Sequence, residues 1–222
     1  ECNFYYPANQ TKYSQLNKDV SFKNKILDSA ESLFTRFGLR SVTMDDIAKE
    51  LSMSKKTLYG CVKDKKELVL LTITKNVLDH KRESEEIFKT ISHPIDQMLA
   101  IFDMMHKRVS EINPSVFFDL KKSYPKAFAK FNSFREEFIF NKIKENLVAG
   151  SQQGLYRTDM DIDLIAKYYI VLVDFIISPI EPNKESIMHM QYELMNYHMR
   201  GIVTEKGLEY LINNPINHGI KI

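Results

Sequence analysis

A short lysine-rich stretch combines residue types that can bind a polyanion. Lys55 and Lys56 fall on the first turn of a helix that Ser54 can cap, and Tyr59 follows one turn later. Ammonium and hydroxyl groups can contact phosphates or base edges, and Gly60 lets a backbone approach closely. The stretch therefore predicts contact with nucleic acid. An ordinary solvated helix face with paired lysines is the alternative.

The residues before this stretch supply an element that can place it in a DNA groove. Thr43 and Asp46 are typical of a helix start in which each side chain caps the other's backbone N–H. A short helix over about 44–51 and a second over about 55–61 are then joined by only three or four residues. This spacing is typical of a helix-turn-helix, whose second helix enters a major groove about 12 Å wide.

The positive charge of the chain is concentrated around this motif. The 222 residues include 31 Lys and Arg against 29 Asp and Glu, a net charge of +2. Residues 22–68 alone carry ten basic and seven acidic side chains. The chain as a whole is therefore no polycation, but the local excess suits phosphate binding.

Apolar residues at three- and four-residue spacing predict helices on both sides of the motif. One stripe runs from Ile26 to Phe37 and stops at Gly38, which adopts the left-handed conformation at little cost. A long helix is expected from Asp64-Lys65 towards Ile91. No run alternates as a strand would, so we predict an all-α fold. Further helices are expected at about 94–111, 115–122, 125–150, 161–178, 184–201 and 204–213, with a loop at 154–159.

The motif resembles the DNA-binding signature of the TetR family. The matching landmarks are Lys25 to Phe34, Phe37-Gly38, Thr43 to Ala48, Ser54 to Tyr59 and Lys65 to Leu68. The resemblance implies an N-terminal three-helix DNA-binding domain, here 22–68, and a larger helical domain for ligand binding and dimerisation, here 69–222. It also implies a transcriptional regulator, by family habit a repressor, and not an enzyme.

By this resemblance the helix from Lys55 is the recognition helix. Thr43 and Tyr59 would hold phosphates, and Lys65 would contact a phosphate from the start of the fourth helix. Ser52 stands where the family usually has a glycine, which suggests a slightly different turn. Val62 stands where an aromatic is usual, which suggests a smaller plug between recognition helix and body. The full set of predicted DNA-binding residues is Thr43, Ser54, Lys55, Lys56, Thr57, Tyr59, Gly60 and Lys65.

The rest of the chain is rich in Phe and Met at helical spacing, which is typical of an apolar core. The resemblance nevertheless implies a cavity for a small apolar or amphipathic ligand between these helices. Candidates for its lining are Phe102, Met105, Phe118, Phe131 and Tyr168. No cofactor is predicted, and the six histidines have no ligand spacing, so no metal site is expected either.

The last two long helices are expected to pair with those of a second copy. The helix at 161–178 has a broad apolar face that only Asp174 interrupts, and this carboxylate is expected to reach solvent or a partner. An isologous four-helix interface would make a homodimer with recognition helices about 34 Å apart, suited to a near-palindromic operator. The apolar face comprises Ile165, Tyr168, Tyr169, Leu172, Val173 and Ile176.

Residues 1–21 form a polar leader that we expect to be disordered or partly ordered. The leader has no apolar stretch and so predicts no signal peptide. The longest apolar run, Tyr168 to Ile177, is too short for a bilayer of about 30 Å. Cys2 and Cys61 fit neither a zinc site nor a disulfide framework. We expect a cytoplasmic protein that binds double-stranded DNA and no membrane.

Three alternatives stay open at the level of the sequence. A TetR-like protein that binds DNA constitutively would have a solid core and no cavity. A helical enzyme with a DNA-binding head would need a nucleophile–base pair, a phosphate loop or metal spacing, and the sequence shows none. A protein-interaction module would not bind DNA with the steep salt dependence of a repressor.

Overall fold

Every regular element that the structure describes is a helix. The computed structural model describes residues 9–177 and 184–214, and within them one isolated bridge joins Tyr156 to Val203. The helices are α1 (Asn9–Phe37), α2 (Met44–Glu50), α3 (Lys55–Cys61), α4 (Lys65–Thr90), α5 (Pro94–Glu111), α6 (Ser115–Ser123), α7 (Pro125–Ser133), the π-helical η1 (Phe134–Ile139), α8 (Phe140–Gln152), α9 (Ile162–Ile177), α10 (Lys184–Ile202) and α11 (Glu205–Asn213).

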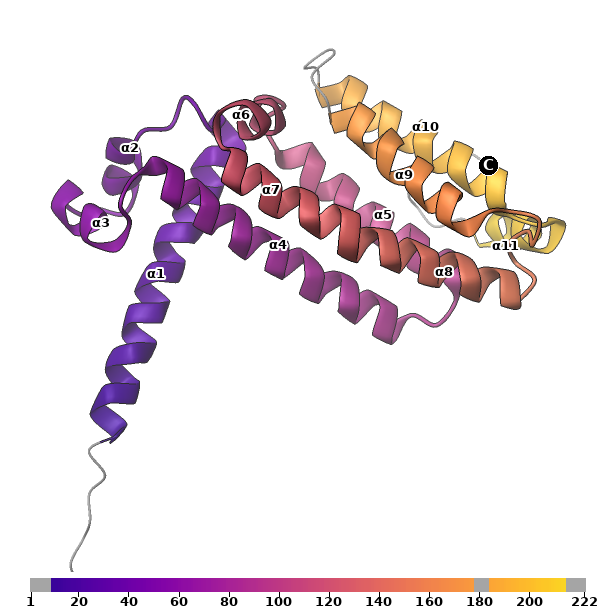
Figure 1. Cartoon of the computed structure of the whole chain (residues 1–222), viewed down its shortest axis with the longest axis horizontal. Coiled ribbons are helices and arrows are strands. Elements are labelled where there is room, and N and C mark those ends of the chain that lie inside the picture. Colours follow the sequence, from indigo (N-terminus) through magenta and orange to yellow (C-terminus); the bar gives the residue numbers. More distant parts are fainter. Residues whose placement is uncertain (1–8, 178–183, 215–222) are drawn as a thin grey trace, which may run out of the picture.

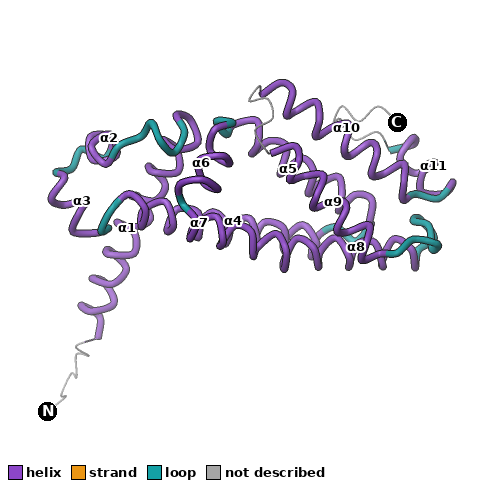
Figure 2. The backbone as a smooth tube through the Cα atoms, turned by 45° about the horizontal axis from the view of Figure 1, so that its top comes forward, coloured by secondary structure: helices purple, strands orange, loops and turns teal. Residues whose placement is uncertain are grey.

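The helices form a small head and a larger body (Figure 1). α2 and α3 lie at one end of the molecule, beside the C-terminal part of α1. α4 runs from this head along α7, while α5 lies against α8 and α10, and α9 packs on both α8 and α10. In Figure 2 the loops are short and lie at helix ends, so α4 is a continuous connection from head to body.

Local sequence signals account for the ends of the head helices. Thr43 and Asp46 cap each other's backbone N–H groups at 2.8 and 3.2 Å, which confirms the predicted capping box. Ser54 accepts a hydrogen bond from the backbone of Thr57 at 3.1 Å. Asp64 accepts one from the backbone of Glu67 at 2.8 Å, and α4 begins directly after it. Such caps satisfy N–H groups that a helix start leaves free.

The first helix is longer than the sequence suggested. α1 begins at Asn9, within the leader that we expected to be disordered or partly ordered, and residues 1–8 lie outside the described residues. No Pro or Gly occurs between Asn9 and Phe37, and polar residues such as Gln and Lys are tolerated in a helix. The helix ends at Gly38, whose φ of 85° is in the left-handed region as predicted.

The expected helix at 125–150 is one path with an unexpected interruption. α7 and α8 follow each other directly through η1, where the backbone adopts the wider π-helical winding. Such insertions occur often at functional sites, because they change the direction of the side chains they carry. Here η1 carries the buried side chains of Phe134 and Arg135 into the body.

Two apolar cores hold the molecule, and the first does not stop at the head. It joins α1–α3 and the start of α4 to Val116, Leu120, Tyr124 and Ala127 of the body. The second core is formed by α5 and α8–α11. A movement of α6 or α7 therefore changes the packing of the head helices, because they share this core. Among the described residues, no helix is long and apolar enough to cross a membrane.

Candidate functional site

The helix-turn-helix is built on a buried seam with a strained corner. Ile47 and Ala48 of α2 and Leu58 of α3 are buried, so the two short helices pack at a fixed angle. In the corner Ser52 has a φ of 51°, the left-handed conformation that favours glycine. The expectation of a slightly different turn at Ser52 stays a prediction, and serine here adopts a conformation that glycine takes readily. Val62 is buried at 2% exposure behind the recognition helix, as a plug would be.

The outer face of α3 is polar and unobstructed. Lys55, Lys56 and Thr57 are exposed, and Tyr59 is 50% exposed, whereas Leu58 between them faces the core. A Cβ built on Gly60 would meet nothing within 4 Å, so another surface can approach the backbone there. The predicted recognition residues thus share one face.

Two of these residues are already held by neighbours within the motif. The Nζ of Lys55 lies 2.6 Å from a carboxylate oxygen of Asp45 in α2, and this hydrogen bond raises the pKa of Lys55. The hydroxyls of Ser54 and Thr57 are 2.8 Å apart. The Lys55 pair is exposed, and exposed ion pairs contribute little to stability. Lys55 can therefore exchange Asp45 for a phosphate at small cost.

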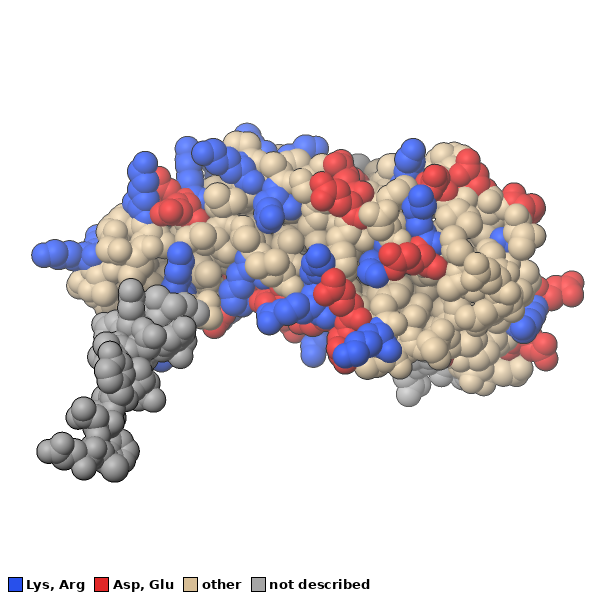
Figure 3. Space-filling view, turned by 60° about the horizontal axis from the view of Figure 1, so that its bottom comes forward, with Lys and Arg blue, Asp and Glu red and all other residues tan. Residues whose placement is uncertain are grey.

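Thr43 and Lys65 lie apart from the α3 face, at the starts of α2 and α4. Thr43 is exposed, and Lys65 is partly buried with its Nζ 3.3 Å from the carbonyl oxygen of Arg40. Burial lowers the pKa of Lys65, while Asp119 and Asp46 act in the opposite direction. Figure 3 shows Lys and Arg side chains projecting from the end of the molecule that carries α2 and α3. The predicted DNA-binding residues thus form two groups on one basic end.

A cavity of about 220 Å³ lies in the body and reaches the head. Phe102, Met105 and Phe131 line it, as expected from the sequence. Phe118 and Tyr168 do not: they are 41% and 53% exposed, and their neighbours Phe117 and Tyr169 line the cavity instead. Successive residues of a helix point about 100° apart, so a choice between neighbours requires the packing and not the composition.

The polar lining of the cavity was missed by the sequence analysis. Thr72, Asn76 and His80 of α4 lie four residues apart and face it on one stripe. The side chain of Thr72 donates to the carbonyl oxygen of Leu68 at 2.9 Å, and the amide of Asn76 donates to Glu31 at 2.7 Å. A repeat of polar residues on the buried face of an amphipathic helix could have indicated this stripe.

His80 is a buried titratable group of this stripe. It is 9% exposed, next to 4% for Thr72, and its ring lies edge-on to Phe134 with 6.2 Å between the ring centroids. Burial, followed by the charge of Arg108, lowers the pKa of His80 to about 4. The imidazole is therefore neutral at pH 7, with one nitrogen that donates and one that accepts.

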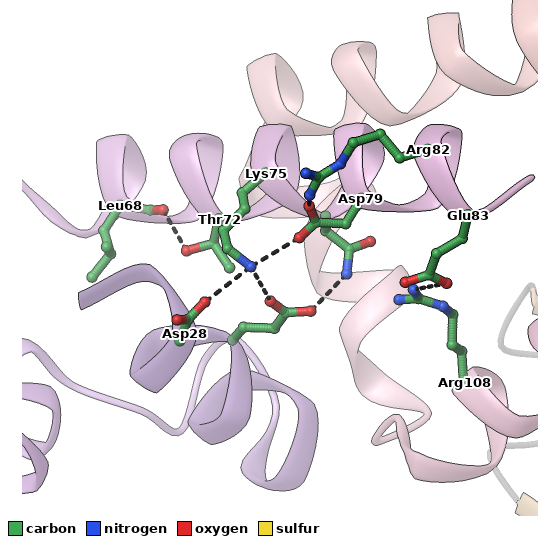
Figure 4. A network of polar contacts seen from close by, with 10 residues as sticks. Asp28, Leu68, Thr72, Lys75, Asp79, Arg82, Glu83 and Arg108 are labelled. Carbon is green, nitrogen blue, oxygen red and sulfur yellow. Dashed lines mark hydrogen bonds and ion pairs between the residues drawn. The ribbon is translucent and has the colours of Figure 1, made fainter. Parts of the chain in front are cut away.

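A network of charges ties α1 to α4 beside the cavity (Figure 4). The Nζ of Lys75 lies 2.9 Å from both Asp28 and Asp79 and 3.6 Å from Glu31. Burial lowers the pKa of Lys75, but the hydrogen bonds to Asp79 and Asp28 outweigh it and raise the pKa. Asp28 and Glu31 belong to α1, so this single ammonium group joins the head to the first half of α4.

The other charged groups at the cavity also have partners. Arg108 of α5 donates to Glu83 of α4 at 2.6 Å. Arg135 of η1, 7% exposed, forms an ion pair with Asp174 of α9. The expectation that Asp174 reaches solvent or a partner is thus confirmed. The pair also connects the cavity wall to the outer helix α9.

The apolar face of α9 differs from the one expected. Ile165 and Tyr169 pack on the second core, Val173 lines the cavity, and the side chain of Ile176 lies outside the described residues. Tyr168 and Leu172 are exposed as the expectation required. The exposed apolar side chains are Leu164, Tyr168, Val171, Leu172 and Phe175 of α9 and Tyr197 of α10, which we call the α9 face.

Known proteins with related sequences and folds are transcription regulators. Residues 26–71 match the model of bacterial regulatory proteins of the tetR family. The HTH-type transcriptional regulator YhgD of Bacillus subtilis is 25% identical over 160 residues, 69% of this chain and 83% of that protein. The HTH-type transcriptional repressor KstR2 of Mycolicibacterium smegmatis is 22% identical over 160 residues, 68% of this chain and 76% of its own.

The fold itself recurs in solved structures. A transcriptional regulator from Saccharomonospora viridis superposes with a TM-score of 0.64 at 20% identity, covering 84% of this chain and 100% of that one. The expectation that the chain is a regulator and not an enzyme agrees with these relatives. The helix-turn-helix segment thus matches the tetR family of bacterial regulatory proteins, about two thirds of the chain is similar to HTH-type transcriptional regulators, and the fold is that of the solved regulators.

Proposed function

We propose that the protein is a homodimeric repressor that releases a near-palindromic operator when a small molecule occupies the body cavity. The observation that carries the DNA-binding part is the exposed, unobstructed face of α3 on a basic end of the molecule. A helix with such a face fits a major groove. The repeat of this face in two subunits is the reason for a palindrome.

The DNA contacts divide by position. Lys56 and Thr57 stand on the exposed first turn of α3 and are assigned to base edges. Thr43, Tyr59 and Lys65 are assigned to phosphates, which fix position without reading sequence. The remaining members of the set support this arrangement: Ser54 caps α3, Lys55 exchanges Asp45 for a phosphate, and Gly60 permits close approach.

The α9 face supports the dimer. Five large apolar side chains are exposed on α9 at three- and four-residue spacing, so they share one side of that helix, and Tyr197 of α10 is exposed as well. Exposed apolar patches are typical of interaction sites. A second copy related by a twofold axis would cover the patch with the same residues, as a four-helix interface. The expected domain division at residue 68 then separates a DNA-binding unit from a body that binds ligand and partner.

The cavity supports control by a ligand, because its walls belong to both units. Phe34 and Thr35 of α1 and Val69 of α4 line it together with residues of α5, α7 and α9. A second link runs from the body: the backbone N–H of Asn113 donates to the carbonyl oxygen of Thr35 at 2.7 Å. A molecule in the cavity therefore acts on α1 and α4, which hold the head. Ligand binding a hundredfold tighter to the released state supplies about 2.7 kcal/mol of coupling.

A constitutive DNA-binding protein without an inducer is the alternative. The cavity favours the ligand-controlled repressor, because a constitutive relative needs no empty space at its core. The fold neighbour from Saccharomonospora viridis was solved in complex with choline, so a small-molecule ligand is compatible with a regulator of this fold.

Selection of bound sequences from a random duplex pool tests the proposal. We expect an enriched near-palindrome whose half-sites are separated by about one helical turn, or a multiple of it. Binding should weaken steeply as salt is raised. Failure to enrich any sequence at low salt would contradict DNA recognition. An enriched sequence without twofold symmetry would contradict the dimer alone.

A further inference from the structure

We propose that the cavity takes an uncharged, mainly hydrocarbon molecule with a hydroxyl, carbonyl or amide group, which hydrogen-bonds to Asn76 and His80 of α4. The inference rests on the proposed ligand-controlled function and specifies the chemistry of its ligand. It follows from three properties of the cavity wall: the state of its charges, the free hydrogen-bonding groups, and the size of the space.

No enclosed charge of the described wall is left to receive an ion. Arg108 is paired with Glu83, and Arg135 is paired with Asp174. Glu31 receives Lys75 and the amide of Asn76. Glu111, the remaining charged residue of the lining, is exposed to solvent. An ionic ligand would therefore lose its hydration without gaining a counter-charge, or would have to break an existing pair, and either step is costly.

Neutral hydrogen-bonding groups, in contrast, are free at the α4 stripe. Among the described residues, His80 has no hydrogen-bond partner although it is 9% exposed and lines the cavity. Asn76 uses its amide nitrogen for Glu31, while its carbonyl oxygen accepts no hydrogen bond within the described chain. The two residues are one helical turn apart, about 6 Å along α4. One small polar group between them can use both.

The rest of the cavity wall is mainly apolar and suits a hydrocarbon ligand. Phe102, Phe117 and Phe131 contribute ring surface, and aliphatic side chains of α4, α5 and α9 fill the gaps between them. The space of about 220 Å³ corresponds to roughly seven waters at about 30 Å³ each. A molecule with eight to ten non-hydrogen atoms, on this order-of-magnitude basis, fits such a space.

The bond from Asn76 to Glu31 gives the ligand a route to the head. Glu31 lies on α1, and within the described chain Asn76 is the one residue of the α4 stripe that hydrogen-bonds to it. A ligand that attracts the Asn76 amide weakens this bond and so changes how α1 rests on α4. Recognition of the polar group and release of the head then involve the same side chain.

Three small molecules that share an alkyl chain and differ in their polar end group test the proposal on the protein without DNA. Octan-1-ol, octanoate and octylammonium are titrated at pH 7.5, and their dissociation constants are measured by calorimetry. We expect octan-1-ol to bind at least tenfold more tightly than either ion. A preference below tenfold, a tighter ion, or no binding of octan-1-ol up to its solubility limit overturns the proposal. Because no DNA is present in this titration, its result does not depend on whether the protein binds an operator. Operator binding is tested separately by the duplex selection.

A matched pair of variants tests the assignment to His80. His80→Phe keeps the aromatic contact with Phe134 but removes both nitrogens, and octan-1-ol should bind at least fivefold more weakly. His93→Phe is the control, because His93 stacks on Tyr210 outside the cavity, with 3.8 Å between ring centroids. It should bind octan-1-ol like the unmodified protein. Equal binding by both variants overturns the role of His80. If His80→Phe does not fold, Asn76→Leu replaces it, and the comparison of the three probes still decides.

Discussion

At the scale of single residues, the left-handed conformation of Ser52 lowers the free energy of unfolding by a measurable amount. A left-handed conformation costs a non-glycine residue about 1–2 kcal/mol, while glycine loses about 0.5–1 kcal/mol through greater freedom in the unfolded chain. Ser52→Gly should therefore raise the free energy of unfolding by up to about 1 kcal/mol in urea denaturation. Ser41→Gly is the control, because Ser41 is not among the described residues with positive φ. It should lower stability, and equal effects of both changes would contradict the strain at Ser52.

Lys56 and Lys65 carry the same charge but are assigned different tasks. Lys56→Ala should change which sequence a random pool yields, because a base contact carries about 1–3 kcal/mol of discrimination. Lys65→Ala should weaken binding to all duplexes alike and make the salt slope shallower by about one unit. Affinity selection and salt titration of both variants decide. If Lys56→Ala leaves the preferred sequence unchanged, the recognition face of α3 has been assigned to the wrong residues.

Two buried histidines make stability depend on pH. Burial lowers the pKa of both His80 and His198 to about 4, from 6.5 for a free histidine. Below pH 6.5 the unfolded chain binds protons that the folded chain does not, so stability is lost as the pH falls towards 4, by about 1.4 kcal/mol per pH unit for each histidine. His80→Phe or His198→Phe should each make the dependence of unfolding free energy on pH less steep. An unchanged slope in both variants would contradict burial of the neutral rings.

At the scale of helices, the contact of α1 with α4 depends on Lys75. Lys75→Met removes the cation that faces Asp28, Glu31 and Asp79 and leaves these carboxylates to repel one another. We expect a loss of about 1–2 kcal/mol in the free energy of unfolding. Lys89→Met is the matched control, because Lys89 of α4 is paired in the described structure only with exposed Glu86 at 3.9 Å, and it should cost at most about 0.5 kcal/mol. Similar losses in the two variants would mean that the network does not hold the head.

The helices of the head could be predicted because their ends are fixed by nearby residues. Thr43, Ser54 and Asp64 each cap a helix within their own first turn, so no distant contact is needed to find those starts. The start of α1 was missed because the polar composition of the leader was taken for disorder. η1 was missed because a π-helical turn depends on packing between distant helices, which no local pattern reveals.

The parts of the candidate site also differ in how far they could be predicted, because some depend on local sequence and others on packing between distant helices. The exposed face of α3 that we propose binds DNA was predicted from a dense local motif. For the cavity, the sequence predicted which helices surround it but not all of the residues that line it. The choice between Phe117 and Phe118, or between Tyr168 and Tyr169, depended on how each helix is rotated about its axis. A rotation of one residue places a side chain in the cavity or in solvent. The α4 stripe shows that polar residues at helical spacing deserve the same search as apolar ones.

At the scale of the whole molecule, the proposed function depends on two heads held together by paired bodies. Either head alone has a single recognition helix, whereas a dimer binds the second half-site at a high effective concentration. Because the α9 face is the proposed contact, its loss should separate the subunits without unfolding them. Val171 is 61% exposed on this face, so a charged residue there is tolerated in the monomer but not in a dry interface.

Val171→Glu should therefore yield a folded monomer and lower the affinity for the full palindrome by at least about a hundredfold, because the gain from joining two binding sites is commonly 10²–10⁴. Its affinity for a single half-site should change little, since α3 lies at the other end of the molecule (Figure 1). Leu78→Glu is the control: Leu78 is 54% exposed on α4, outside the α9 face, and this variant should remain dimeric. Sedimentation and duplex titration measure both properties. If Val171→Glu stays dimeric, the subunits meet elsewhere, and if it is monomeric but binds the palindrome unimpaired, dimerisation is not what gives the operator its affinity.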